Sequence, residues 1–102
     1  MAFARALQEN IGASRVLLFG SHARDSAQLD SDVDIIVVSE AFRDVPPARR
    51  AIGLRAIWYE AGGNAPMDLI CLTSDEFEQA SRGITLIAAV LPEAIDLLPI
   101  AA

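Results

Sequence analysis

Residues 15–38 read RVLLFGSHARDSAQLDSDVDIIVV and contain two predicted strands around a polar segment, the strongest indication of the fold. It begins with a short apolar run, Arg15–Phe19, that stops at Gly20, which is typical of a buried strand. It ends with a second run, Val33–Val38, that is rich in β-branched residues. Val33, Ile35 and Val37 would point to one face of this strand, and Ile36 and Val38 would point to the other face. The strand is therefore expected to be buried on both faces, as in an α/β sheet.

On either side of residues 15–38, the sequence predicts helices and one further buried strand. Met67–Leu72 (MDLICL) is a third apolar run of strand length. Helical spacing of apolar residues, prolines suited to a first turn, a capping-box pair and glycine stop signals predict the helices. The expected helices span Phe3–Ile11, Pro46–Ala61, Ser74–Ala80 and Ile84–Leu91, and a last edge strand spans Ile95–Leu98. This order predicts an α/β fold, with a small sheet of three to four strands and helices packed against it.

The composition predicts one ordinary soluble domain over residues 1–102. Hydrophobic residues make up 53% of the chain and charged residues 22%, which excludes intrinsic disorder. The single cysteine, Cys71, and the single histidine, His22, exclude a disulfide framework and a multi-cysteine zinc module. Neither a targeting segment nor an apolar tract long enough to span a membrane is visible, so a cytoplasmic protein without membrane contact is expected.

The charge balance restricts the expected partners. Fourteen acidic residues stand against eight basic ones, for a formal net charge of −6, so direct DNA binding is not expected. All eight basic residues are arginines, which excludes a P-loop lysine and a Schiff-base lysine. Arg49, Arg50 and Arg55 lie on different sides of their predicted helix. This favours solvated side chains over a nucleic-acid-binding stripe.

Three aspartates at the starts of predicted strands form the candidate metal site. Asp32 and Asp34 alternate at the start of the second strand, so they face one side about 7 Å apart along the backbone. Asp68 opens the third strand between two apolar residues, where a carboxylate rarely lies without a partner. Magnesium prefers such oxygen ligands, and three carboxylates from two strands can hold two ions. The alternative for Asp32 and Asp34 is a polar turn that leads into a strand.

Gly20, Ser21 and Arg24 form the candidate phosphate site. A glycine at a strand-to-helix turn lets backbone N–H groups approach an anion closely, although such a glycine is more often a simple turn residue. Ser21 adds a hydroxyl donor, and the guanidinium of Arg24 suits a phosphate tail. His22 is interpreted as a loop residue beside this site. Together with the aspartates, these residues predict a site for a nucleoside triphosphate.

The combination of Gly20-Ser21, a ten-residue gap, Asp32-Val33-Asp34 and a later strand with Asp68 resembles a known family. It is similar to the minimal nucleotidyltransferases of the DNA polymerase β superfamily. The resemblance implies a nucleotidyltransferase-like fold with a mixed sheet, and transfer of a nucleoside monophosphate, AMP from ATP, with two Mg²⁺ ions. It further implies that Asp32 and Asp34 bind the ions and that Asp68 completes the cluster and activates the acceptor.

The same resemblance implies a partner. Similar short chains are often encoded beside a HEPN-type ribonuclease toxin and act as its antitoxin by adenylylating it. For the oligomeric state of this chain, the sequence leaves both a homo-oligomer and a hetero-oligomer open. The alternative is a catalytically inactive module of the same fold that binds a nucleotide or a partner protein. Asp25 motivates this alternative, because the family pattern often has glycine after the arginine.

Overall fold

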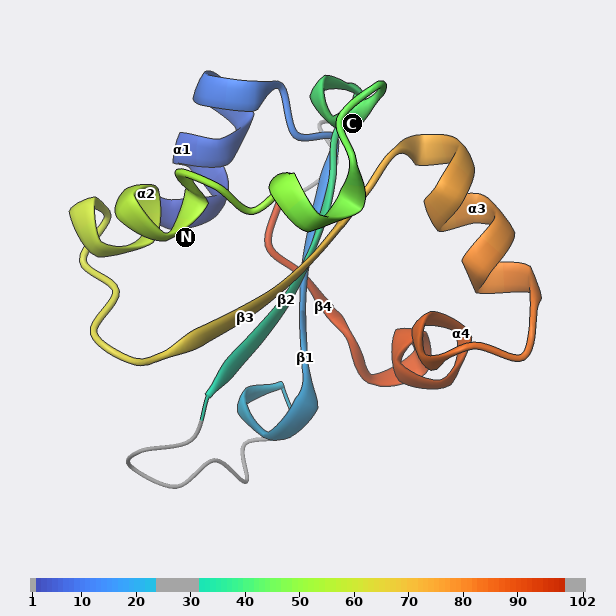
Figure 1. Cartoon of the computed structure of the whole chain (residues 1–102). Coiled ribbons are helices and arrows are strands. Elements are labelled where there is room, and N and C mark those ends of the chain that lie inside the picture. Colours follow the sequence, from blue (N-terminus) through green and yellow to red (C-terminus); the bar gives the residue numbers. More distant parts are fainter. Residues whose placement is uncertain (1, 24–31, 99–102) are drawn as a thin grey trace.

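The three apolar runs form the strands expected from the sequence, with the same bounds. The structure is a computed structural model and describes residues 2–23 and 32–98 (Figure 1). The helices are α1 (Ala2–Ile11), α2 (Leu54–Glu60), α3 (Ser74–Arg82) and α4 (Leu86–Val90), and the strands are β1 (Arg15–Phe19), β2 (Val33–Val38), β3 (Met67–Leu72) and β4 (Ile95–Asp96). Short 3₁₀ turns are η1 (Gly20–His22), η2 (Glu40–Phe42), η3 (Pro47–Arg49) and η4 (Leu91–Glu93).

The four strands form one mixed sheet in the order β3-β2-β1-β4. β1 pairs antiparallel with β2, and Phe19 lies opposite Asp34. β2 pairs parallel with β3, and Asp34 lies beside Asp68 in that register. β4 pairs antiparallel with β1 along two residues, which makes it shorter than the edge strand expected over Ile95–Leu98. The expected α/β fold with a small mixed sheet is thus confirmed.

Helices cover both faces of the sheet, with α1 and α2 on one side and α3 and α4 on the other (Figure 1). On the first side, Val33, Ile35 and Val37 of β2 pack in a core cluster with residues of α1 and α2. On the other side, Ile36 and Val38 pack in a second cluster with residues of α3 and α4. The two-sided burial expected for this strand is confirmed.

The helix expected to start at Pro46 begins eight residues later, at Leu54. Pro47–Arg49 forms only a 3₁₀ turn, and Gly53 before the helix adopts φ 86°. A residue in this left-handed region interrupts right-handed helical hydrogen bonding, so the two segments are separate elements. The other expected helices are present with shifted ends: α3 runs on to Arg82, and α4 is limited to Leu86–Val90. None of the described helices is long and apolar enough to cross a membrane.

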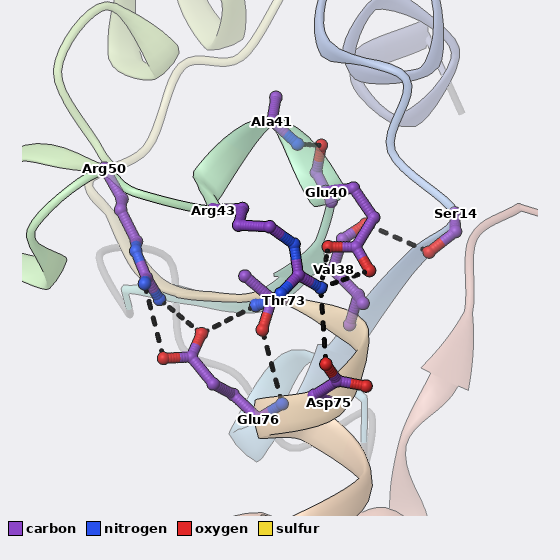
Figure 2. Close-up of polar contacts among 10 residues, drawn as sticks. Ser14, Val38, Glu40, Ala41, Arg43, Arg50, Thr73, Asp75 and Glu76 are labelled. Carbon is purple, nitrogen blue, oxygen red and sulfur yellow. Dashed lines mark hydrogen bonds and ion pairs between the residues drawn. The ribbon is translucent and has the colours of Figure 1, made fainter.

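The expectation that Arg50 is solvated is wrong, because its side chain is only 7% exposed. Its Nε donates to the carbonyl of Val45 at 2.9 Å, and its Nη1 donates to the carbonyl of Cys71 at 3.2 Å. Nη1 also donates to Glu76 Oε1 at 2.6 Å, and that oxygen accepts the amide of Thr73 at 2.8 Å (Figure 2). The guanidinium therefore joins the loop after β2, the end of β3 and the capped start of α3.

This network predicts acid-sensitive stability. Hydrogen bonds from Arg50, followed by the Thr73 amide, lower the pKa of Glu76 from 4.5 to about 2. Because the folded pKa lies below the unfolded one, Glu76 stabilises the protein above about pH 4.5, and this contribution disappears as the pH falls towards 2. We expect Glu76→Gln to lose about 1–2 kcal/mol at pH 7 and to flatten this acid dependence, as measured by urea unfolding. The value is below that of a fully buried pair, since the Glu76 side chain is 40% exposed.

Glu78 provides the matched control on the same helix. It pairs with Arg82, and both side chains are more than half exposed. We expect Glu78→Gln to change the free energy of unfolding by less than about 0.5 kcal/mol. Equal losses in the two variants would contradict the special role of the Arg50–Glu76 pair.

Candidate active site

One end of the sheet gathers the residues that the sequence analysis selected. β1 ends there in the η1 turn, and β2 and β3 begin there (Figure 1). Asp34 lies beside Asp68 in the parallel register, and Asp32 is two residues before Asp34. Residues that alternate along a strand share a face, so Asp34 and Asp68 belong to the face that α3 and α4 cover further along the sheet. Asp32 precedes β2, and its charge acts on Asp34. Strand alternation and register together create this acidic cluster.

Asp34 is the innermost of the three aspartates. It is partly buried, whereas Asp32 and Asp68 are exposed. Burial is the largest cause that raises the pKa of Asp34, and the charges of Asp68 and Asp32 raise this pKa further. The charge of His22 lowers it in part. The ionised form of Asp34 is thus disfavoured in the protein alone, and a cation at this position would relieve that cost.

Gly20 lies directly against Asp34, which gives it a role beyond that of a turn residue. Its φ is 76°, in the region that favours glycine. An added Cβ would overlap the Oδ2 atom of Asp34 and lie 3.3 Å from its Cγ. The absence of a side chain at Gly20 therefore leaves the space that the Asp34 carboxylate occupies. The η1 turn and the start of β2 are thereby closely packed.

The donor chemistry of the cluster fits a hard divalent cation, because carboxylate oxygens are the ligands that Mg²⁺ prefers. In this structure the three carboxylates lie too far apart to bind one ion together. Among residues 2–23 and 32–98, no three His, Cys, Asp or Glu side chains are close enough together to hold an ion. Two of its members, Asp32 and Asp68, are exposed at the starts of their strands, where their side chains can change rotamer.

The predicted phosphate site is only partly described. Ser21 belongs to the η1 turn, next to Gly20. Arg24 and Asp25 lie outside the described residues. His22, interpreted from the sequence as a loop residue, lies in η1 within electrostatic reach of Asp34. Its place directly after Gly20-Ser21 was the sequence signal for this proximity, but the fold of the turn was needed to establish it.

These observations define a class of protein. It is a small α/β domain with acidic residues at the starts of adjacent strands, next to a turn that contains a glycine. A comparison with protein families gives the family: the model of the nucleotidyltransferase domain matches residues 1–99. The chain belongs to this family, and its general class is that of transferases that move nucleotidyl groups. No curated protein matches the sequence.

A solved structure supports the fold alone. BolA1 from Arabidopsis thaliana superposes with a TM-score of 0.53 at 17% sequence identity. The match covers 72% of this chain and 89% of that chain. At this identity the likeness concerns the arrangement of helices and strands and carries no inference about activity.

Proposed function

We propose that this protein is a Mg²⁺-dependent nucleotidyltransferase that moves AMP from ATP to an acceptor, with pyrophosphate as the leaving group. The observation that carries the proposal is the register that sets Asp34 beside Asp68, with Gly20 against the Asp34 carboxylate. The family match to the nucleotidyltransferase domain supports the reaction class. The raised pKa of Asp34 supports a cation site, because a cation would offset the burial and the charges of Asp68 and Asp32 that disfavour the ionised carboxylate.

Each selected residue has a proposed role in this reaction. Asp32, Asp34 and Asp68 hold the metal, and the exposed Asp68 also accepts the proton from the acceptor hydroxyl. When bound, Mg²⁺ neutralises phosphate oxygens and stabilises the charge that develops during phosphoryl transfer. The backbone N–H groups at Gly20 and Ser21 bind the triphosphate, and Arg24 neutralises its tail.

We propose further that residues 1–102 act as a single cytoplasmic domain and that the acceptor is a protein, namely a HEPN-type toxin for which this chain is the antitoxin. Large apolar side chains on the surface support a protein partner: Ile84 is fully exposed, and Leu86 is 60% exposed. Both flank the start of α4, and α4 covers the face of the sheet to which Asp34 and Asp68 belong. An acceptor protein docked there would lie on the catalytic side of the domain.

A second candidate function is an inactive module that binds nucleotide or partner without transfer. The open state of the carboxylate cluster in the described residues favours it, as does Asp25 in place of the glycine often found there. The two candidates differ in turnover rather than in fold or ligand.

Label transfer from ATP distinguishes these functions. We expect the purified chain with α-labelled ATP, Mg²⁺ and a lysate of the source cells to label a protein band. Chelation of the metal with EDTA should abolish this labelling, and added Mg²⁺ should restore it. γ-labelled ATP serves as the control, because a nucleotidyltransferase leaves the γ-phosphate in the pyrophosphate and transfers no label.

Each outcome has a distinct meaning. Labelled RNA instead of protein would retain the transferase and overturn the protein acceptor. Mg²⁺-dependent ATP binding by calorimetry without any labelled product would favour the inactive module. Labelling that persists in EDTA would contradict the metal dependence.

A further inference from the structure

Among the residues that the structure describes, β3 forms one edge of the sheet, with β2 as its one neighbouring strand. The amides of Val33 and Ser39 donate to the carbonyls of Pro66 and Leu72, at 2.8 Å and 3.0 Å. In a parallel ladder the N–H and C=O of one residue point the same way, so the even-numbered residues of β3 face β2. The backbone groups of its odd-numbered residues therefore point away from the sheet.

These outward backbone groups belong to Met67, Leu69 and Cys71. Arg50 Nη1 donates to the outward carbonyl of Cys71, which closes the end of the edge that adjoins α3. The outward groups of Met67 and Leu69 form no hydrogen bond with any described part of the chain. A strand edge with such groups is a ready template for pairing with another strand.

The side chains of β3 lead to the same conclusion. Those of residues 69–72 are apolar and only half-buried, although they alternate between the two faces of the sheet. On the neighbouring β2, Ile35, Ile36 and Val37 are completely buried. Both helical layers thus cover β2 fully but leave β3 incompletely covered, so apolar surface is exposed on both sides of the same open edge.

We propose that this edge of β3 pairs antiparallel with the same edge of a second copy, so that one sheet continues across a dimer. Pairing centred on Leu69 sets the outward groups of Leu69 opposite those of Leu69 in the second copy. Asp68 then lies opposite Ile70 of the second copy. A register centred on Asp68 would instead place two carboxylates face to face, which is unfavourable.

A second copy fits this edge better than an unrelated peptide does. Asp68 is the only charged residue in Met67–Leu72, so the strand is complementary to itself in the Leu69-centred register. In this register Met67 lies opposite Cys71 of the second copy, whose carbonyl already accepts a hydrogen bond from Arg50, so the two Leu69 residues supply the central hydrogen bonds between the copies. This inference is independent of the proposed function and needs no catalytic activity.

Sedimentation velocity over a range of concentrations tests the dimer. We expect Leu69→Pro to raise the dimer dissociation constant at least about tenfold, since proline removes an outward N–H that the dimer would use. Leu69→Lys should act in the same direction, because lysine at strand edges opposes pairing. Leu86→Lys is the control, as Leu86 is also apolar and 60% exposed but lies on α4. Circular dichroism verifies that each variant is folded.

Hydrogen exchange on the unaltered protein gives a second test that needs no variant. The amide of Leu69 should exchange at least about tenfold more slowly at concentrations where the dimer forms. The amide of Ile70 faces β2 and serves as the internal control, with protection at every concentration. A chain that stays monomeric throughout would overturn the proposal. So would a dimer in which exchange at Leu69 is unchanged, or one that Leu69→Pro and Leu86→Lys affect equally.

Discussion

Asp34→Asn is expected to abolish nucleotidyl transfer while the protein remains folded. Asp34 is the inner member of the acidic cluster, beside Asp68 in the register and against Gly20. Asparagine keeps the shape but loses the charge that a metal ligand needs, so we expect at least a 100-fold loss in label transfer from ATP, a value on the order of losing one group that stabilises transition-state charge.

Although Asp34→Asn should lose activity, its stability should stay the same or increase. Burial and the charges of Asp68 and Asp32 raise the pKa of Asp34, so its ionised form is unfavourable in the protein without metal. Asp34→Asn should therefore unfold at the same urea concentration as the original protein or at a higher one. Asp44→Asn is the control, because Asp44 is exposed, adopts φ 66° and tolerates asparagine in that conformation. A variant at Asp34 with full activity would contradict the proposed metal site.

Gly20→Ala is expected to cause the second large loss of activity. Its Cβ would overlap Asp34 Oδ2, so either the carboxylate or the η1 turn must move. Displacement of about 1 Å in a catalytic constellation can reduce the rate about 100-fold, and we expect a loss of this order in label transfer. The left-handed φ adds a stability cost of about 1–2 kcal/mol for alanine.

Gly12→Ala separates these two effects. Gly12 has a similar φ of 62°, but a Cβ there would meet no atom within 4 Å. We expect Gly12→Ala to lose comparable stability in urea unfolding and to retain full transfer activity. If both variants were equally impaired in transfer, the contact between Gly20 and Asp34 would not be the cause.

The strands could be predicted from the sequence because their signal is local. Val33–Val38 is an uninterrupted apolar run between polar residues, and its bounds in the structure are those expected. The start of α3 was equally local, since Thr73 and Glu76 form both reciprocal bonds of a capping box. Where only composition was available, as in the short edge strand after Ala94, the bounds shifted.

The sequence could not predict features that depend on distant partners. The burial of Arg50 requires acceptors from Val45, Cys71 and Glu76, which lie in three different segments. Helical spacing alone therefore assigned this arginine to the solvent. The interruption of α2 depends on the left-handed φ of Gly53, which the pattern of apolar residues does not reveal.

In the candidate site, too, local features could be predicted from the sequence, whereas contacts between distant residues could not. Alternation along β2 and an apolar setting for Asp68 were sufficient to select the three aspartates, and the register confirms that Asp34 and Asp68 are neighbours. Their roles in catalysis remain predictions, as do those of Ser21 and Arg24. The contact of Gly20 with Asp34 could not be predicted, because it joins the η1 turn to the start of β2, two segments that are apart in the sequence.

The two ends of β2 differ in their chemistry. The acidic cluster lies where β2 begins, and the Arg50 network lies beyond its other end, where the loop, β3 and α3 are joined. Substitutions that strengthen the second end should raise the melting temperature without changing the proposed catalytic residues. Such a stabilised protein would tolerate a redesigned acceptor or nucleotide specificity at the first end, because losses there could be offset elsewhere.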